Sequence, residues 1–448
     1  MSGTTRAPAL ADVLLAAAQA VQAVQAGASL TEALGHTPVA LRPATQAISF
    51  HAMRRLGTAM AVRALLVPRK PPSALLEALL LVAFSLLEDP ASERDTAPSQ
   101  DGTELPRGHA PSYAAHTVVD QAVRAASGHR KLAAFKGLVN GALRRFLRER
   151  DAILGKVANA PESTWNYPAW WVEQLQRDYP QNWQDILQAG NHQGPLTLRV
   201  NRRRASREQV LAEFAAAGMA ATPVGEHGLL LDHARPVQQL PGFDAGWWSV
   251  QDLGAQMAAP LLAVRDGMRV LDACAAPGGK TAHLLETADI DLLALDSDAG
   301  RLERVRGNLD RLGLHAQLRA ADAADPSTWW DGRPFDAVLA DVPCTASGIV
   351  RRHPDIRWLR RANDIDRTAA LQVRITDSLW QVVAPGGTLL YATCSVFPTE
   401  GERQAAAFAS RHPDARRLPS PGQLLPAGLD ATPAVQHDGF FYALFTKA

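Results

Sequence analysis

The chain has 448 residues, 47% hydrophobic and 20% charged, and this length allows two or three domains with a core in each. Its three cysteines, an odd number, argue against a disulfide framework and indicate a reducing compartment. The net charge is +1, but residues 1–155 carry 17 Lys and Arg against 12 Asp and Glu, a bias compatible with a polyanionic partner.

The apolar segments do not predict a membrane protein. The stretch 74–87 is too short to cross a bilayer and contains Glu77, so we expect a buried helix there. The N-terminal apolar run resembles a signal peptide only weakly, because Asp12 interrupts it. We therefore expect a cytoplasmic protein without membrane contact, acting as a monomer.

Helical periodicity over 8–87 and again over 113–150 predicts an all-α first domain, to which we assign residues 1–155. A polar stretch rich in Pro, Ser and Asp, 88–112, separates the two helical parts and predicts a long mobile loop.

Residues 156–248 are expected to form linker helices followed by a small α+β module that binds RNA. The helical part carries Trp165, Trp170, Trp171 and Trp183, and strand-like segments such as LTLRVN and WWSVQD follow.

Residues 249–448 are expected to form the third domain. From Met268 onward, apolar strands alternate with amphipathic helices, the pattern of a doubly wound, mostly parallel, Rossmann-like α/β sheet. Cys and His lack zinc-type spacing, so no metal site is expected.

A glycine-containing turn follows the first strand of this domain, in VLDACAAPGGKT. It is not a phosphate loop, because Cys274 stands where the first glycine of that motif belongs, and it lacks the spacing of a dinucleotide fingerprint. The remaining nucleotide-type ligand is S-adenosylmethionine. Four acids at successive strand ends favour it, and among them Asp296 is suited to the ribose hydroxyls and Asp322 to the adenine. These four acids are Asp272, Asp296, Asp322 and Asp341.

Two thiols lie at neighbouring strand ends, Cys344 in ADVPCTASG and Cys394 in YATCSV. A thiolate that adds to C6 of cytosine makes C5 nucleophilic, so C5 accepts a methyl group before the thiol is eliminated. The scheme also needs a carboxyl partner for N3 and a base. On the residues alone, either thiol is a candidate nucleophile, whereas Cys274 is expected to be a small buried side chain.

Several motifs resemble the Sun family of bacterial ribosomal-RNA cytosine-5 methyltransferases, whose product from the methyl donor is S-adenosylhomocysteine. They are DACAAPGGKT, ALDSD, ADVPCTASG, IVRRHPDIRWLRR, YATCSVFPTEGE, LTLRVN, LPGFDAGWWSVQD and DGFFYALF. KLAAFKGLVNGALRRF fits an N-terminal domain similar to the antitermination factor NusB. The resemblance covers nearly the whole chain. It implies C5 methylation of a cytosine in 16S ribosomal RNA through a covalent adduct at C6.

The resemblance also implies residue roles. Cys394 would attack C6, Cys344 would assist product release as base or protonating partner, and Asp341 would contact N3. The donor site would consist of Cys274, Ala275, Ala276, Pro277, Gly278, Gly279, Lys280, Asp296, Asp322 and Asp341.

Arginine and aromatic residues near these motifs suit phosphate contacts and base stacking. The expected RNA contacts are Arg351, Arg352, Arg357, Trp358, Arg202 and Arg203. A weaker basic tract is formed by Arg144, Arg145, Arg148 and Arg150.

Two alternatives remain open at this point. One keeps the chemistry but changes the substrate to transfer RNA. The other is an RNA-binding or assembly factor with an inert transferase domain.

Overall fold

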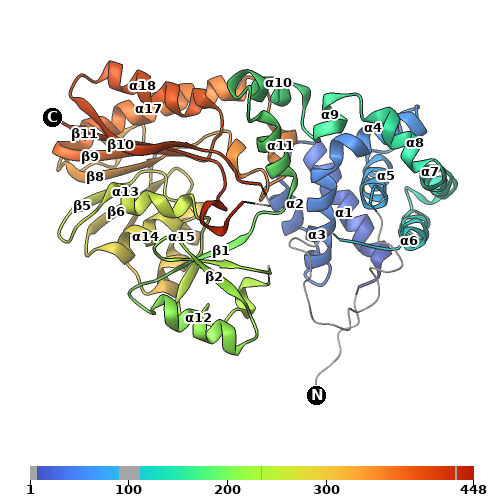
Figure 1. Cartoon of the computed structure of the whole chain (residues 1–448), viewed down its shortest axis with the longest axis horizontal. Coiled ribbons are helices and arrows are strands. Elements are labelled where there is room, and N and C mark those ends of the chain that lie inside the picture. Colours follow the sequence, from blue (N-terminus) through green and yellow to red (C-terminus); the bar gives the residue numbers. More distant parts are fainter. Residues whose placement is uncertain (1–7, 90–110, 234, 429–430) are drawn as a thin grey trace. The chain divides into compact units, whose positions relative to one another are not determined.

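The computed structural model describes residues 8–89, 111–233, 235–428 and 431–448 (Figure 1). The chain divides into two compact units. The first consists of Met1–His192 and Arg352–Arg361, and the second of Gln193–Arg351 and Ala362–Ala448. Within the described residues, no helix combines the length and apolar character needed to cross a membrane.

The first unit is helical, as predicted. Its helices are α1 (Leu10–Gln25), α2 (Leu30–Gly35), α3 (Arg42–Arg54), α4 (Leu56–Leu66), α5 (Ala74–Leu87), α6 (Ala115–Gly128), α7 (Lys136–Arg148), α8 (Arg150–Val157), α9 (Pro161–Trp165), α10 (Ala169–Asp178), α11 (Trp183–Asn191) and α16 (Ile356–Leu359). Helix α5 is the expected buried helix, with almost every residue from Leu75 to Leu87 in the core. Its one carboxylate, Glu77, pairs with Arg63 at 2.6 Å. The proposed likeness to NusB remains a prediction.

The segment 352–361 belongs to the first unit although it follows the Cys344 motif in sequence. Asp355 accepts a hydrogen bond from the backbone N–H of Leu30 (2.9 Å), and the indole N–H of Trp358 donates to the Met53 carbonyl (2.9 Å). Arg357 is fully buried and donates to the Gly190 carbonyl (2.6 Å). The Arg357 side chain therefore anchors the segment 352–361 in the helical unit.

The three predicted domains remain a prediction. By their contacts, residues 156–192 cluster with the first compact unit and not with the strands that follow them. The Asn166 side chain accepts from the backbone N–H of Thr58 (2.9 Å), and the Arg357 guanidinium lies 3.8 Å from the centre of the Tyr167 ring. These contacts, invisible to local sequence patterns, join α9–α11 to the helical bundle. Most of the predicted loop at 88–112 lies outside the described residues.

The second unit begins with a four-stranded antiparallel sheet in the order β2-β3-β1-β4. Its elements are β1 (Leu196–Val200), α12 (Arg207–Ala216), β2 (Ala221–Val224), β3 (Gly228–Leu231) and β4 (Trp248–Val250). Trp248 and Phe214 pack edge to face in its core, with ring centroids 6.3 Å apart.

The predicted doubly wound sheet is confirmed as a seven-stranded sheet in the order β10-β11-β9-β8-β5-β6-β7. Its elements are α13 (Ala258–Leu262), β5 (Arg269–Asp272), α14 (Gly279–Thr287), β6 (Asp291–Asp296), α15 (Ala299–Leu312), β7 (Gln317–Ala320), β8 (Phe335–Asp341), α17 (Asp364–Val382), β9 (Val383–Thr393), α18 (Glu402–Arg411), β10 (Ala415–Leu424) and β11 (Phe440–Lys447). Strands β5 to β9 pair in parallel, whereas β11 is antiparallel to both its neighbours.

Successive strand residues point to opposite faces, and each face has its own helices. Val270 packs with α13, α14 and α15, whereas Leu271 packs with α17 and α18. The chain runs from β5 outward to β7 and then returns to β8 on the other side of β5. Ligands of such sheets bind at the carboxyl ends of the strands near this reversal.

Replacing Arg357 by Ala should lower the free energy of unfolding of the full chain by about 3 kcal/mol, because several buried acceptors lose their charged donor. Urea denaturation measures this change. The exposed Arg367 provides the control, and R367A should shift stability by less than about 0.5 kcal/mol. Equal stabilities of the two variants would contradict the structural role of Arg357.

Candidate active site

The two thiols predicted from the sequence lie together. Cys344 follows β8 and Cys394 follows β9, and their sulfur atoms are 3.5 Å apart with both thiols reduced. Each side chain is half-buried, so the pair is neither sealed in the core nor fully in solvent. Both cysteines can therefore reach one small target.

Parallel pairing of β8 with β9 brings the thiols together. Asp341 is in register with Ala392, and the backbone N–H of Gly348 donates to the Cys394 carbonyl (2.9 Å). The loop after β8 then folds tightly against the segment before β11. A Cβ atom on Gly348 would lie 2.2 Å from the Gly439 carbonyl oxygen, so only glycine fits there.

The carboxylate of Glu400 joins the two thiol loops. Glu400 ends the short 3₁₀ helix Pro398–Glu400 and is fully buried. One oxygen accepts from the backbone N–H of Thr345 (2.8 Å), next to Cys344, and the other from the Ser395 hydroxyl (2.6 Å), next to Cys394. Its hydroxyl partners also include Thr368 of α17. A buried carboxylate with this many donors fixes the loops firmly.

A second set of hydrogen bonds reinforces this junction. The Ser347 and Ser395 hydroxyl oxygens lie 2.9 Å apart, and the Val396 backbone N–H donates to Ser347 (2.9 Å). The Tyr391 hydroxyl donates to the backbone carbonyl of Glu400 (2.7 Å). The thiol separation is thus set by a continuous polar network and not by the strands alone.

The environment of Cys344 favours its protonated form. The pKa of the Cys344 thiol is raised well above its usual value, first by the hydrogen bond to Cys394 and second by removal from water. The negative charge of Glu400 acts in the same direction. Cys344 therefore keeps its proton at neutral pH.

Asp341 at the end of β8 meets Lys280 at the start of α14. The Lys280 ammonium lies 2.6 Å from the Asp341 carboxylate and 5.5 Å from the centre of the Phe440 ring. Burial disfavours the charged lysine, but Asp341 together with Tyr442 and Cys394 outweighs this effect and raises the pKa of Lys280 above its usual value. The ion pair connects the glycine-containing turn to the strand that leads to Cys344.

The predicted donor turn lies at the carboxyl end of β5. Gly278 has a φ of +96°, which suits glycine, and a Cβ atom there would lie 3.0 Å from Val305. The buried Asp296 at the end of β6 accepts from the backbone N–H of Ala276 in this turn (3.2 Å). Asp322, after β7, is exposed and accepts from the backbone N–H of Ala324 (2.9 Å).

Two further groups support the turn. Asp272 is buried and accepts from the Thr281 hydroxyl (2.7 Å), and burial raises its pKa to about 7. Cys274 in the same turn is half-buried, and removal from water raises the pKa of its thiol above its usual value.

These residues fit S-adenosylmethionine. A strand edge lined by carboxylates repels phosphates but attracts a sulfonium cation, and the same carboxylates accept hydrogen bonds from ribose hydroxyls. Residues 274–280 with Asp296 would hold the donor beside β5 and β6, and the donor would supply an electrophilic methyl group.

Some predicted RNA contacts require correction. Arg351 is buried, where it pairs with Asp438 and lies 3.9 Å from Asp252, so it holds the thiol loop to the segment before β11. Arg357 and Trp358 are held inside the first unit by the contacts described above. Burial of the two guanidinium groups and the commitment of the Trp358 N–H disfavour RNA binding by these residues.

The other predicted contacts remain predictions. Arg202 and Arg203 are exposed just before α12, although Arg203 also donates to the Ala288 carbonyl (2.7 Å). Arg352 is half-buried in the first unit.

Two residues of the site were not predicted from the sequence. Glu400 lies in YATCSVFPTEGE, six residues after Cys394, and this proximity to the thiol was the one available signal. Arg199 of LTLRVN is buried, pairs with Glu286 (2.6 Å) and donates to the Gly279 carbonyl (2.8 Å). It fastens the small sheet to the donor turn, and nothing in its own sequence segment indicated that partner.

The doubly wound sheet, the glycine-containing turn and the carboxylates at its strand ends define the class of S-adenosylmethionine-dependent methyltransferases. Comparison with known families narrows this class. The family 16S rRNA methyltransferase RsmB/F matches residues 259–446, and the RsmF/B-like ferredoxin-like domain matches residues 167–238.

Relatives extend the match over the whole chain. The ribosomal RNA small subunit methyltransferase B of Pseudomonas putida is 41% identical over 97% of this chain and 98% of its own length. That of Vibrio cholerae is 44% identical over 74% of this chain and 77% of its own. The crystal structure of the protein PH0851 has a TM-score of 0.75 at 25% identity, covering 98% of this chain and 99% of that one. The chain belongs to the RsmB/Sun family of bacterial methyltransferases.

Mild oxidation tests the thiol geometry. Because a disulfide needs sulfur atoms about 2.05 Å apart, a small rotation suffices to join Cys344 to Cys394. Treatment with diamide should remove two of the three free thiols reversibly within one chain, and C344A should abolish this crosslink. Crosslinks only between chains would contradict the arrangement.

Removing the Glu400 carboxylate should slow that crosslink several-fold and lower the free energy of unfolding by about 3 kcal/mol, because several buried donors lose their acceptor. E400L tests this, with E402L as control, since Glu402 lies two residues away and is exposed. An E400L variant that crosslinks at the wild-type rate would show that Glu400 does not hold the loops.

Proposed function

We propose that this protein transfers a methyl group from S-adenosylmethionine to C5 of a cytosine in 16S ribosomal RNA, through a covalent cysteine adduct at C6. The observation that carries the proposal is the pair of reduced thiols 3.5 Å apart beside the donor turn. The names of the relatives support small-subunit ribosomal RNA as the substrate.

The chemistry requires two thiol roles. C5 of cytosine is a poor nucleophile until a thiolate forms a bond to C6, after which C5 attacks the methyl group and S-adenosylhomocysteine leaves. Loss of the C5 proton and cleavage of the sulfur–C6 bond then restore the ring. One thiol thus serves as the nucleophile, while the other accepts or donates a proton during release of the methylated base.

Cys394 is the proposed nucleophile, because the family resemblance implies this role for it. The sulfur atoms of Cys344 and Cys394 are within hydrogen-bond distance, and either can be the donor. The hydrogen bond and removal from water raise the pKa of the Cys344 thiol, which is compatible with its proposed role in proton transfer.

Asp341 is the proposed partner of cytosine N3. The Asp341 carboxylate pairs with Lys280, and an anion beside N3 favours protonation of the ring during thiolate addition. The exposed Pro343 between Asp341 and Cys344 marks the open side of the site, where a base turned out of the RNA would enter. Arg202, Arg203 and Arg352 are proposed RNA contacts.

Single cysteine variants separate the roles of the thiols. C394A should reduce methyl transfer from tritiated donor to 16S ribosomal RNA by at least about a thousandfold, since the adduct cannot form. C344A should accumulate a covalent protein–RNA complex that migrates slowly on a denaturing gel. A complex with C394A instead would reverse the two roles.

The exposed Arg367 again provides the control, and R367A should retain transfer, because its printed partner is Asp364 and it belongs to neither the thiol pair nor the donor turn. Bisulfite sequencing of the treated RNA would then locate the methylated cytosine. Incorporation into transfer RNA but not into 16S ribosomal RNA would contradict the proposed substrate, and RNA binding without any incorporation would support an inert assembly factor.

A further inference from the structure

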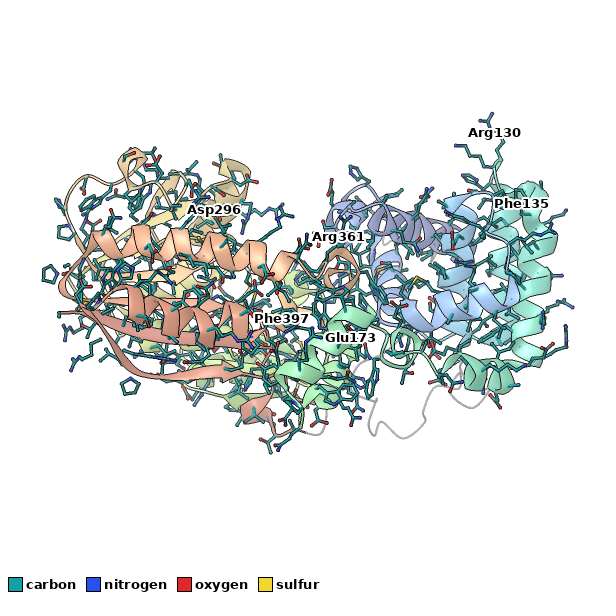
Figure 2. All side chains as sticks on the ribbon, turned by 90° about the horizontal axis from the view of Figure 1, so that it is seen from above. Arg130, Phe135, Glu173, Asp296, Arg361 and Phe397 are labelled. Carbon is teal, nitrogen blue, oxygen red and sulfur yellow. The ribbon has the colours of Figure 1, made fainter. Side chains whose placement is uncertain are left out.

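The first unit contains an open groove of about 810 Å³ between helices α6 and α7. Val119, Val123 and Leu147 contribute apolar side chains to its lining. Figure 1 shows the two helices at one end of the helical unit, and Figure 2 labels Arg130 and Phe135 on the segment that joins them. The groove is remote in sequence from every residue of the proposed methyl-transfer site.

The α7 side of the groove is basic. Lys136, Asn140, Arg144 and Arg148 follow one another at intervals of four residues, so they share one face of the helix. Successive positions are about 6 Å apart along the axis, given the rise of about 1.5 Å per residue. The three cations are exposed, and none forms an ion pair with another residue in the described parts of the chain.

Several other charges near the groove are paired. Asp120 of α6 also lines the groove, but its carboxylate pairs with Arg124 at 2.9 Å. Outside the groove, Arg145 pairs with Glu149 (3.4 Å) and Arg150 with Asp151 (3.1 Å). The cations that line the groove are therefore not balanced by a carboxylate, and the exposed Arg130 and Lys131, on the segment between the two helices, add further positive charge.

We propose that this groove binds the sugar-phosphate backbone of the RNA substrate, with Lys136, Arg144 and Arg148 contacting phosphates. The inference rests on the proposed function and names a second RNA-binding surface for it. Regularly spaced cations match the repeating charge of a polyanion. The amide of Asn140 adds a neutral hydrogen-bond donor, and the apolar lining accommodates ribose and base faces.

The test compares two triple variants of the full-length chain. K136A/R144A/R148A removes the groove cations, and R145A/R150A/K156A removes the same charge from the neighbouring surface. Binding of 16S ribosomal RNA transcript is measured by filter retention at several salt concentrations. Circular dichroism should show both variants folded, because all six side chains lie largely at the surface.

The groove variant should bind RNA at least tenfold more weakly at about 0.1 M salt. The slope of log K against log salt concentration should become less steep by about two to three, since each lost phosphate contact contributes roughly 0.7–0.9 to that slope. The control variant should lose much less of its affinity for RNA. Wild-type affinity and slope in the groove variant would overturn the proposal and indicate a different ligand, such as a protein. Equal losses in both variants would also overturn it, because the effect would then be one of net charge.

Methyl transfer distinguishes failure of this proposal from failure of the proposed function. At saturating RNA, the groove variant should reach the wild-type turnover rate, because its substitutions raise only the RNA concentration required. If wild-type protein transfers no methyl group while the groove variant still binds RNA more weakly, the groove assignment stands and the catalytic one fails.

Discussion

The carboxylate of Glu400 is the constraint on which the thiol site depends. It is fully buried and bonds to residues adjacent to both cysteines, Thr345 on one loop and Ser395 on the other. A buried carboxylate without partners would cost several kcal/mol, so the loops must present their donors to it whenever the protein is folded. Folding of this region and convergence of the two thiols are consequently one event. The same negative charge also raises the pKa of the Cys344 thiol, together with the contact to Cys394 and removal from water.

The order of the strands connects this site to the methyl donor. Because β5 lies beside β8, and β8 beside β9, the donor turn, Asp341 and the two thiols occupy neighbouring strand ends. The ion pair of Lys280 and Asp341 links the donor turn to the end of β8. The buried Arg199 connects the donor turn to the small antiparallel sheet. The catalytic unit is thus held together by a few buried charges at the edge of an apolar sheet. The helical unit adds a separate basic surface whose charges remain available to a polyanion.

Local patterns in the sequence were sufficient for much of this picture. Alternation of strands and helices predicted the doubly wound sheet, and the placement of Cys344 and Cys394 at adjacent strand ends predicted their proximity. The features that these local patterns did not reveal depend on contacts between distant segments. Arg351 and Arg357 read as exposed arginines near a motif, yet their partners, Asp438 and Gly190, are 87 and 167 positions away. The contacts of α9–α11 with α4 and with the segment 352–361, which place residues 156–192 in the first compact unit, likewise join segments far apart in the sequence. Glu400 lies close to Cys394 in the sequence, but no pattern there revealed that its side chain bonds to both thiol loops.

The most direct test of the account is to identify the sulfur that bonds to RNA in the wild-type enzyme. In 16S ribosomal RNA transcribed with 5-fluorocytidine, fluorine at C5 cannot leave as a proton, so elimination stops and the sulfur–C6 bond persists. After digestion with nuclease and protease, mass spectrometry should find the methylated fluorocytidine on the peptide that contains Cys394. Attachment to the Cys344 peptide would contradict the assignment of the nucleophile, and the absence of any adduct under conditions that methylate normal RNA would contradict covalent catalysis.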